Sequence, residues 1–134
     1  SLSPNDVLPG ISETLAFLRE RGVPIAVFSS SKNADFILNR IGLDGAFDGI
    51  VAGNDITHSK PHFEGYLLAA ERIGIDPRLC LMVEDAAAGL AGASALSMRT
   101  IRVGAKLPAE IADVTLSDTG RLREQIERLI AEFC

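Results

Sequence analysis

Residues 79–89 have the sequence LCLMVEDAAAG, and this stretch indicates the fold of the whole chain. Its five leading apolar residues are enough for a buried strand, and the small residues that end it favour a helix packed closely on a sheet. Between the two lie the carboxylates of Glu84 and Asp85. A strand, polar residues and then a helix are typical of an α/β protein with a parallel sheet.

The same unit recurs along the chain. Apolar runs predict further strands, and helical periodicity together with Gly and Pro signals predicts helices. The expected strands cover residues 23–28, 47–52, 79–83, 100–103 and 114–116, and the expected helices cover 11–21, 33–41, 61–73, 86–96 and 121–133. Because strands and helices alternate, we expect an α/β, Rossmann-like fold, with a mostly parallel sheet and helices on both faces. Phe63 and Tyr66 are expected on the core face of their helix.

Length and composition exclude several classes of protein. The 134 residues fit one domain, and a hydrophobic content of 47% is too high for a disordered chain. A net charge of -5 is unlike the basic footprint of a nucleic-acid-binding protein. No segment is apolar enough to span a bilayer, so we expect no membrane contact and a cytoplasmic location. Cys80 and Cys134 have neither a disulfide framework nor metal-ligand spacing.

A run of polar residues joins the strand expected at 23–28 to the next helix. It consists of Ser29, Ser30, Ser31, Lys32 and Asn33. Free backbone N–H groups at a helix start, together with serine hydroxyls, favour an anion such as phosphate. Ordinary N-capping explains a single serine or asparagine here equally well. Three serines followed by lysine and asparagine favour the phosphate interpretation.

Two further motifs follow other strands. Lys60, which precedes Pro61, would present a compact positive charge to an anion, although a solvated surface lysine is the alternative. The adjacent carboxylates Glu84 and Asp85 are costly to bury unless something compensates them, and Mg²⁺ does so. Capping of the following helix is an alternative that is compatible with metal binding. Carboxyl ends of parallel strands share one edge, so the chain predicts a single pocket for phosphate and Mg²⁺. His58 and His62, for which the sequence supplies no partner, are expected to be structural.

Together, these motifs resemble the haloacid dehalogenase (HAD) superfamily, and within it the β-phosphoglucomutase-like branch. The resemblance rests on residues 7–10, 29–33, 53–55, 59–61, 83–89 and 101–104. It implies that Ser29 and the backbone after it hold the transferred phosphoryl group and that Lys60 neutralises this group. It also implies that Asp85 binds Mg²⁺ directly, with help from Glu84. The second phosphate of a sugar bisphosphate would be bound by Ser31, Lys32 and Asn33, beside Ser30.

The chain departs from the family pattern in two places. Phe63 stands where the family usually has a proline. More importantly, the family's first strand, which ends in the nucleophilic motif Asp-x-Asp, and its helical cap have no counterpart here. Residues 1–134 are therefore expected to form a partial core domain, part of a longer protein and inactive alone. The missing strand is central in the family, so another segment or self-association would fill its slot, unless the flanking strands pair directly.

Three functions remain open from the sequence. The first is β-phosphoglucomutase-like isomerisation of a phosphorylated sugar, and the second is hydrolysis of a sugar phosphate. Both use every motif named above. The third is a non-catalytic domain that binds phosphate and metal, which the missing nucleophile favours for this chain alone. A generic nucleotide binder ranks last, because neither the G-x-G-x-x-G nor the P-loop fingerprint occurs.

Overall fold

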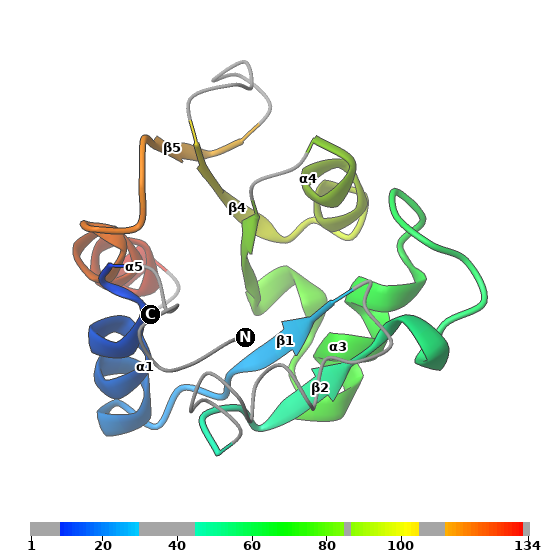
Figure 1. Ribbon diagram of the computed structural model, residues 1–134, viewed down its shortest axis with the longest axis horizontal. Helices are drawn as coiled ribbons and strands as arrows, with labels where there is room; N and C mark the ends of the chain where they lie inside the picture. The colour runs from blue at the N-terminus through cyan, green and yellow to red at the C-terminus, as the bar shows by residue number, and fades with distance from the viewer. Residues whose placement is uncertain (1–8, 30–44, 85–86, 105–111, 133–134) are drawn as a thin grey trace, which may run out of the picture.

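The structure is a computed structural model that describes residues 9–29, 45–84, 87–104 and 112–132 (Figure 1). The five strands in these ranges are all paired in parallel, as the alternation of strands and helices predicts. They form two sheets, in the order β1-β2 and β3-β4-β5. The strands are β1 (Ala26–Phe28), β2 (Gly49–Val51), β3 (Leu81–Glu84), β4 (Arg99–Val103) and β5 (Val114–Leu116).

Helices cover both faces of the strands, as expected. The α-helices are α1 (Ile11–Glu20), α3 (Glu64–Ile73), α4 (Ala87–Ser94) and α5 (Leu122–Glu132), and short 3₁₀ turns occupy η2 (Gly53–Asp55) and η3 (Pro77–Leu79). Consecutive residues of β3 show the two faces. Leu81 packs against the buried cluster that contains residues of α1 and α5, whereas Met82 packs against the cluster that contains residues of α3 and α4. In the described part of the chain, no helix is long and apolar enough to cross a bilayer.

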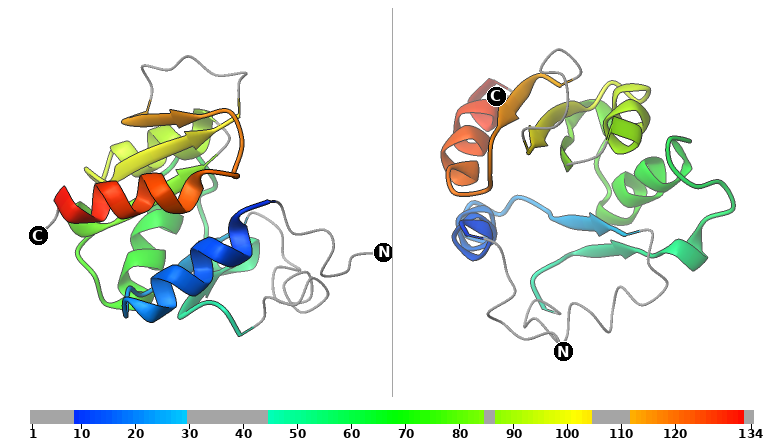
Figure 2. Two further views of the ribbon diagram at one scale, coloured as in Figure 1. Left: turned by 90° about the vertical axis from the view of Figure 1, so that its left-hand side faces the viewer. Right: turned by 45° about the horizontal axis from the view of Figure 1, so that its top comes forward.

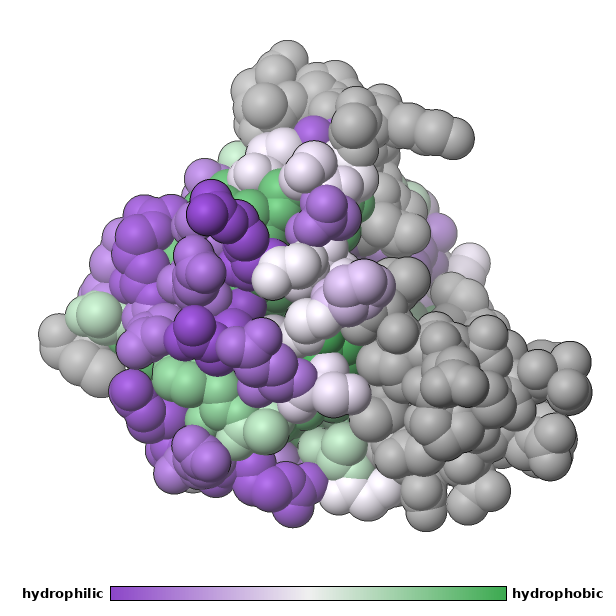
Figure 3. All heavy atoms as spheres, turned by 60° about the vertical axis from the view of Figure 1, so that its left-hand side comes forward, coloured by the Kyte–Doolittle hydropathy of each residue, from purple (hydrophilic) through white to green (hydrophobic). Residues whose placement is uncertain are grey.

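The larger core lies between α1, α5 and the three-stranded sheet. Its fully buried residues include Ile101 of β4 and one stripe of α5, Leu122, Ile126 and Leu129. This stripe is the face that the periodicity of residues 121–133 predicts. On the outward side, Arg123 of α5 pairs with Glu13 of α1 at 2.8 Å. The two helices lie side by side (Figure 2), and hydrophilic side chains gather over this side of the molecule (Figure 3).

The two sheets are not joined by hydrogen bonds among the described residues. There, β1 pairs only with β2, and β3 pairs only with β4. The direct pairing of β1 with β3, one of the two alternatives from the sequence, is therefore not observed in this part of the chain. Val83 of β3 is 36% exposed, although the strands of a doubly covered parallel sheet are normally buried on both faces. One edge of β1 and one edge of β3 thus have no described strand partner.

Some predicted boundaries are wrong. The strand expected at 23–28 begins at Ala26, because the Ile25 N–H donates to the side chain of Asp48 and not to a neighbouring strand. The strand expected at 47–52 covers only Gly49–Val51. The strand expected at 79–83 begins at Leu81, after the turn η3, and includes Glu84. The helix expected at 61–73 begins at Glu64. The helix expected at 33–41 lies outside the described residues.

Candidate phosphate and metal site

Two of the predicted site residues meet at the carboxyl end of β3. Glu84 is the last residue of this strand, and Lys60 lies in the segment between η2 and α3. The Lys60 ammonium donates a hydrogen bond of 3.0 Å to the Glu84 carboxylate. Their side chains are only 19% and 12% exposed. Removing two charges from water is costly, and this contact offsets part of the cost.

The helix α4 reaches this carboxylate because it begins with small residues. A Cβ atom on Gly89 would overlap the side chain of Glu84. Only glycine therefore allows the helix to approach Glu84 so closely. This agrees with the close approach that the small residues of the quoted stretch predict.

Ser29 follows β1 directly and extends its pairing with β2. Its N–H donates to the Val51 carbonyl at 2.9 Å. Phe28, the residue before it, lies beneath the Lys60 ammonium, whose nitrogen is 4.7 Å from the centre of the ring. The start of the serine run and the lysine are thus joined through Phe28. The roles that the resemblance gives to Ser29, Lys60 and Glu84 remain predictions.

Tyr66 of α3 also contacts Lys60 at this site. Its ring centre lies 5.7 Å from the Lys60 nitrogen, and the residue is fully buried. Burial, reinforced by the negative charge of Glu84, raises the pKa of the Tyr66 phenol, so the hydroxyl is neutral at physiological pH. The sequence predicted Tyr66 as a core residue but gave no indication of its contact with Lys60.

The segment before Lys60 is ordered by Glu64. One carboxylate oxygen accepts hydrogen bonds from the N–H groups of Thr57 and His58, and the other lies 3.2 Å from His58 Nδ1. The Glu64 N–H in turn donates to His62 Nδ1 at 3.1 Å. The expectation that both histidines lack partners is therefore wrong. The hydrogen bonds that the Glu64 carboxylate accepts from His58 and Thr57, first of all from the His58 backbone N–H, lower the pKa of Glu64.

Phe63 is also placed differently from the prediction. It is 43% exposed and stacks on His62, with ring centres 4.6 Å apart. His62 stacks in turn on His58 at 4.5 Å. The predicted core position is wrong because α3 begins three residues later than expected, which leaves Phe63 before its first turn.

A family model for haloacid dehalogenase-like hydrolases matches residues 2–96. The chain belongs to this family. This agrees with the resemblance carried by the sequence motifs, and the α/β fold with parallel strands is that of the HAD core.

Relatives and solved structures place the chain in the β-phosphoglucomutase-like branch of the HAD family. A β-phosphoglucomutase from Bacillus subtilis is 34% identical over 121 residues, which is 90% of this chain and 54% of the relative. Hexitol phosphatase B from Escherichia coli is 32% identical over 87% of this chain and 55% of its own length. The crystal structure of a β-phosphoglucomutase from Clostridium difficile matches with a TM-score of 0.92 and 31% identity, covering 98% of this chain and 60% of that one. The chain therefore spans about half the length of the curated relatives it matches.

Five of the eight site residues predicted from the HAD resemblance lie outside the described part of the chain. They are Ser30, Ser31, Lys32, Asn33 and Asp85. Within residues 9–29, 45–84, 87–104 and 112–132, no three His, Cys, Asp or Glu side chains are placed to hold a metal ion together. Mg²⁺ needs only one or two carboxylates, since phosphate oxygens and waters complete its coordination. Glu84 offers carboxylate oxygens at the strand end, so its chemistry fits this ion.

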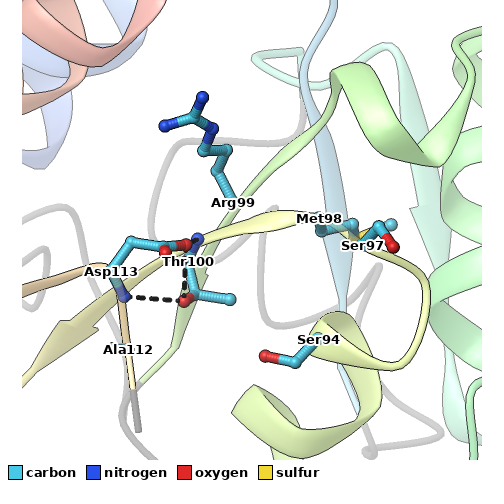
Figure 4. Close-up of a pocket in the computed structure, with 7 residues that line it drawn as sticks. All are labelled: Ser94, Ser97, Met98, Arg99, Thr100, Ala112 and Asp113. Carbon is cyan, nitrogen blue, oxygen red and sulfur yellow. Dashed lines mark hydrogen bonds between the residues drawn. The ribbon is translucent and has the colours of Figure 1, made fainter. Parts of the chain in front are cut away.

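A cavity of about 350 Å³ lies elsewhere, at the amino ends of β4 and β5. Figure 4 shows Ser94, Ser97, Thr100 and Asp113 on its walls. The Asp113 carboxylate accepts hydrogen bonds from the N–H of Thr100 at 2.8 Å and from its hydroxyl at 3.2 Å. Arg99, also on the wall, pairs with Glu132 of α5 at 2.8 Å. These contacts join β4 to the start of β5 and to α5, and the cavity lies at the opposite ends of the strands from Lys60 and Glu84.

Proposed function

We propose that this chain contributes the phosphate- and Mg²⁺-binding part of a phosphotransferase that acts on phosphorylated sugars, with β-phosphoglucomutase-like isomerisation as its reaction. The observation that carries the proposal is the Lys60 ammonium held 3.0 Å from Glu84 at the carboxyl end of β3. The carboxyl ends of parallel strands are where α/β proteins bind ligands. Phosphoryl transfer depends mostly on positioning and on neutralising charge.

Each residue has a proposed role. The Lys60 ammonium has three N–H donors and can share them between Glu84 and the oxygens of the transferred phosphoryl group. The Ser29 hydroxyl and the backbone after it would donate to the same group. Glu84, with Asp85, would hold Mg²⁺, which neutralises phosphate oxygens when it is bound. Ser30, Ser31, Lys32 and Asn33 would bind the second phosphate of a sugar bisphosphate.

The names of the relatives support the substrate class. They include β-phosphoglucomutase, hexitol phosphatase B and a fructose-1-phosphate phosphatase, the last 32% identical over 72% of this chain. The names also divide between isomerase and phosphatase, so hydrolysis of a sugar phosphate is the second candidate function. We also propose a cytoplasmic location for the whole protein.

The sequence itself indicates that the active protein needs a nucleophile from outside residues 1–134. It contains no Asp-x-Asp motif, whose first aspartate would attack phosphorus in this family. We propose that residues 1–134 are a partial core domain and that polypeptide outside this sequence supplies the nucleophile, the cap and a strand beside β1 and β3. A non-catalytic phosphate- and metal-binding domain is the function that this absence favours for the chain alone.

One assay separates these functions. The whole polypeptide that contains this chain is incubated with Mg²⁺ and a panel of β-glucose 1-phosphate, fructose 1-phosphate and hexitol phosphates. Interconversion of glucose phosphates without release of phosphate supports the isomerase, and release of phosphate supports the phosphatase. The absence of both reactions, with retained binding of inorganic phosphate, would leave only the non-catalytic domain. Mg²⁺-dependent turnover by the 134 residues alone would contradict the external nucleophile.

A further inference from the structure

The Lys60 ammonium is enclosed by more than its carboxylate partner. Glu84 lies at 3.0 Å, the ring centre of Phe28 at 4.7 Å and the ring centre of Tyr66 at 5.7 Å. All three partners come from different elements, namely β3, the end of β1 and α3. The side chain retains 19% of its exposure, which leaves room for an approaching ligand. Two aromatic residues and one carboxylate therefore surround the positive charge.

The rings of Phe28 and Tyr66 are in contact with each other. They pack edge to face, with centres 5.0 Å apart and planes at 82°. Tyr66 is fully buried, and a Cβ atom on the preceding residue, Gly65, would overlap the Phe28 ring. Both rings are thus confined by the packing of α3 against β1. A cation between confined rings is held in one place more firmly than a cation on a solvated side chain.

Aromatic rings suit the positioning of the Lys60 ammonium beside a phosphate better than a second carboxylate would. The face of a ring attracts a cation through its quadrupole, yet it carries no net charge. A second carboxylate beside Lys60 would hold the ammonium equally well but would repel a phosphate dianion. The observed partners leave the ammonium with a single negative neighbour among the described residues, and the rings fix its direction without adding repulsion.

We infer that Phe28 and Tyr66 form an aromatic cage that positions the Lys60 ammonium for the phosphoryl group of the substrate. This inference rests on the proposed function, and it adds two positioning residues that act through Lys60. Phe28 has a second consequence, because it immediately precedes Ser29. The same residue therefore contacts the lysine and adjoins the start of the serine run, so both proposed phosphate ligands lie next to it.

The first test observes Lys60 directly in the whole polypeptide and needs no activity. The ε-methylene signal of Lys60 is assigned in ¹H–¹³C NMR spectra as the one that Lys60→Arg removes. Protons that lie over aromatic faces resonate upfield, and we expect this shift for Lys60. Phe28→Leu should remove most of it, whereas Phe17→Leu should not change it. Phe17 is a matched control, because it lies 4.7 Å from the Arg21 guanidinium on another side of the fold.

The second test uses turnover of a sugar phosphate by the whole polypeptide. Phe28→Leu should lower kcat about tenfold, and KM should change less, because a displaced ammonium matters most as charge develops in the transition state. Tyr66→Phe keeps the ring and removes a hydroxyl that has no hydrogen-bond partner among the described residues. It should retain more turnover than Tyr66→Leu. Replacing Phe28 by fluorinated phenylalanines, which keep the ring shape but weaken its negative face, should lower kcat stepwise with fluorine content.

Each outcome decides a different point. An unshifted Lys60 signal in the wild-type chain, or one unaffected by Phe28→Leu, would overturn the cage. A shifted signal with unchanged kcat in the fluorinated series would overturn the positioning role while leaving the contact intact. A whole polypeptide inactive on every sugar phosphate would overturn the proposed function, and the NMR comparison would still decide whether the rings hold Lys60. The fluorinated series also covers the case in which Phe28→Leu fails to fold.

Discussion

Gly89 and Glu84 are in such close contact that the glycine leaves no room for a side chain between them. The position of α4 and the position of the Glu84 carboxylate are therefore linked. A side chain at position 89 must push the Glu84 carboxylate away or move the helix, and displacement of the carboxylate would disturb its contact with Lys60 at 3.0 Å. The smallest residue of the quoted stretch thus maintains the main ion pair of the candidate site.

Gly89→Ala should therefore destabilise the chain. Alanine in a helix is normally better than glycine by about 1 kcal/mol, but forcing an extra methyl group into a packed site costs about 1–3 kcal/mol. The two effects together give a net loss of about 0–2 kcal/mol in the free energy of unfolding, measured with urea. Gly45→Ala is the control, because a Cβ there would meet nothing within 4 Å. A Gly89→Ala variant more stable than wild type would contradict the described contact.

Lys60→Ala should reduce turnover of the whole polypeptide more than it reduces stability. Loss of a group that neutralises transition-state charge typically costs a factor of about 10²–10³ in kcat. The stability cost is that of leaving Glu84 partly buried without its partner, about 1–3 kcal/mol.

Asp85→Ala should abolish Mg²⁺-dependent activity and leave the fold intact, as judged by circular dichroism. If either variant turns over sugar phosphate at the wild-type rate, the role assigned to that residue is wrong.

Glu64→Ala should loosen the segment that leads to Lys60. The carboxylate accepts the N–H groups of Thr57 and His58, and without it both amides open to water. We expect hydrogen exchange at these two amides to accelerate about tenfold, as the loss of a net hydrogen bond implies. Glu64→Gln retains an acceptor oxygen and should exchange more slowly than the alanine variant. Equal exchange rates in both variants would show that the carboxylate does not order this segment.

Asp76 should contribute an acid-sensitive part of the stability. Its carboxylate accepts from the side chain and then from the backbone N–H of Arg78, which lowers its pKa from 3.8 to about 2. A lowered pKa in the folded state means that the stabilisation is complete above pH 3.8 and is lost as the pH falls towards about 2. The Tm difference between wild type and Asp76→Asn should therefore be constant near neutral pH and shrink over this acidic range. Arg78→Gln should remove most of the same dependence, and a difference independent of pH would refute the assignment.

The regular elements could be predicted because their signals are local. The strand at 114–116 matches β5 exactly in its bounds, and α5 shows the buried stripe that its periodicity indicates. Boundaries fail where a side chain replaces a backbone partner. The helix α3 begins at Glu64, whose N–H donates to the His62 ring, a side-chain contact that a pattern of Pro and apolar residues does not reveal.

The aromatic surroundings of Lys60 could not be predicted, because they join distant parts of the chain. Phe28 and Tyr66 each satisfy a local apolar pattern, and nothing in those patterns tells which residues face a cation. The buried Arg102, 4% exposed and in register with Glu84, appeared only as one residue of a family motif. An arginine inside an apolar strand is a signal that sequence reasoning could have used, since a buried charge requires a partner.

Asp113 should prove structural, although it lines a cavity of about 350 Å³. Its carboxylate accepts two hydrogen bonds from Thr100, and its N–H donates to the Thr100 hydroxyl at 3.1 Å. This exchange ties the start of β5 to β4, so Asp113→Ala should lower the free energy of unfolding by about 1–2 kcal/mol. Asp113→Asn keeps an acceptor and should lose less. In the whole polypeptide, neither variant should change KM for a sugar phosphate, because the cavity is at the amino ends of the strands. A raised KM with unchanged stability would instead make this cavity part of the substrate site.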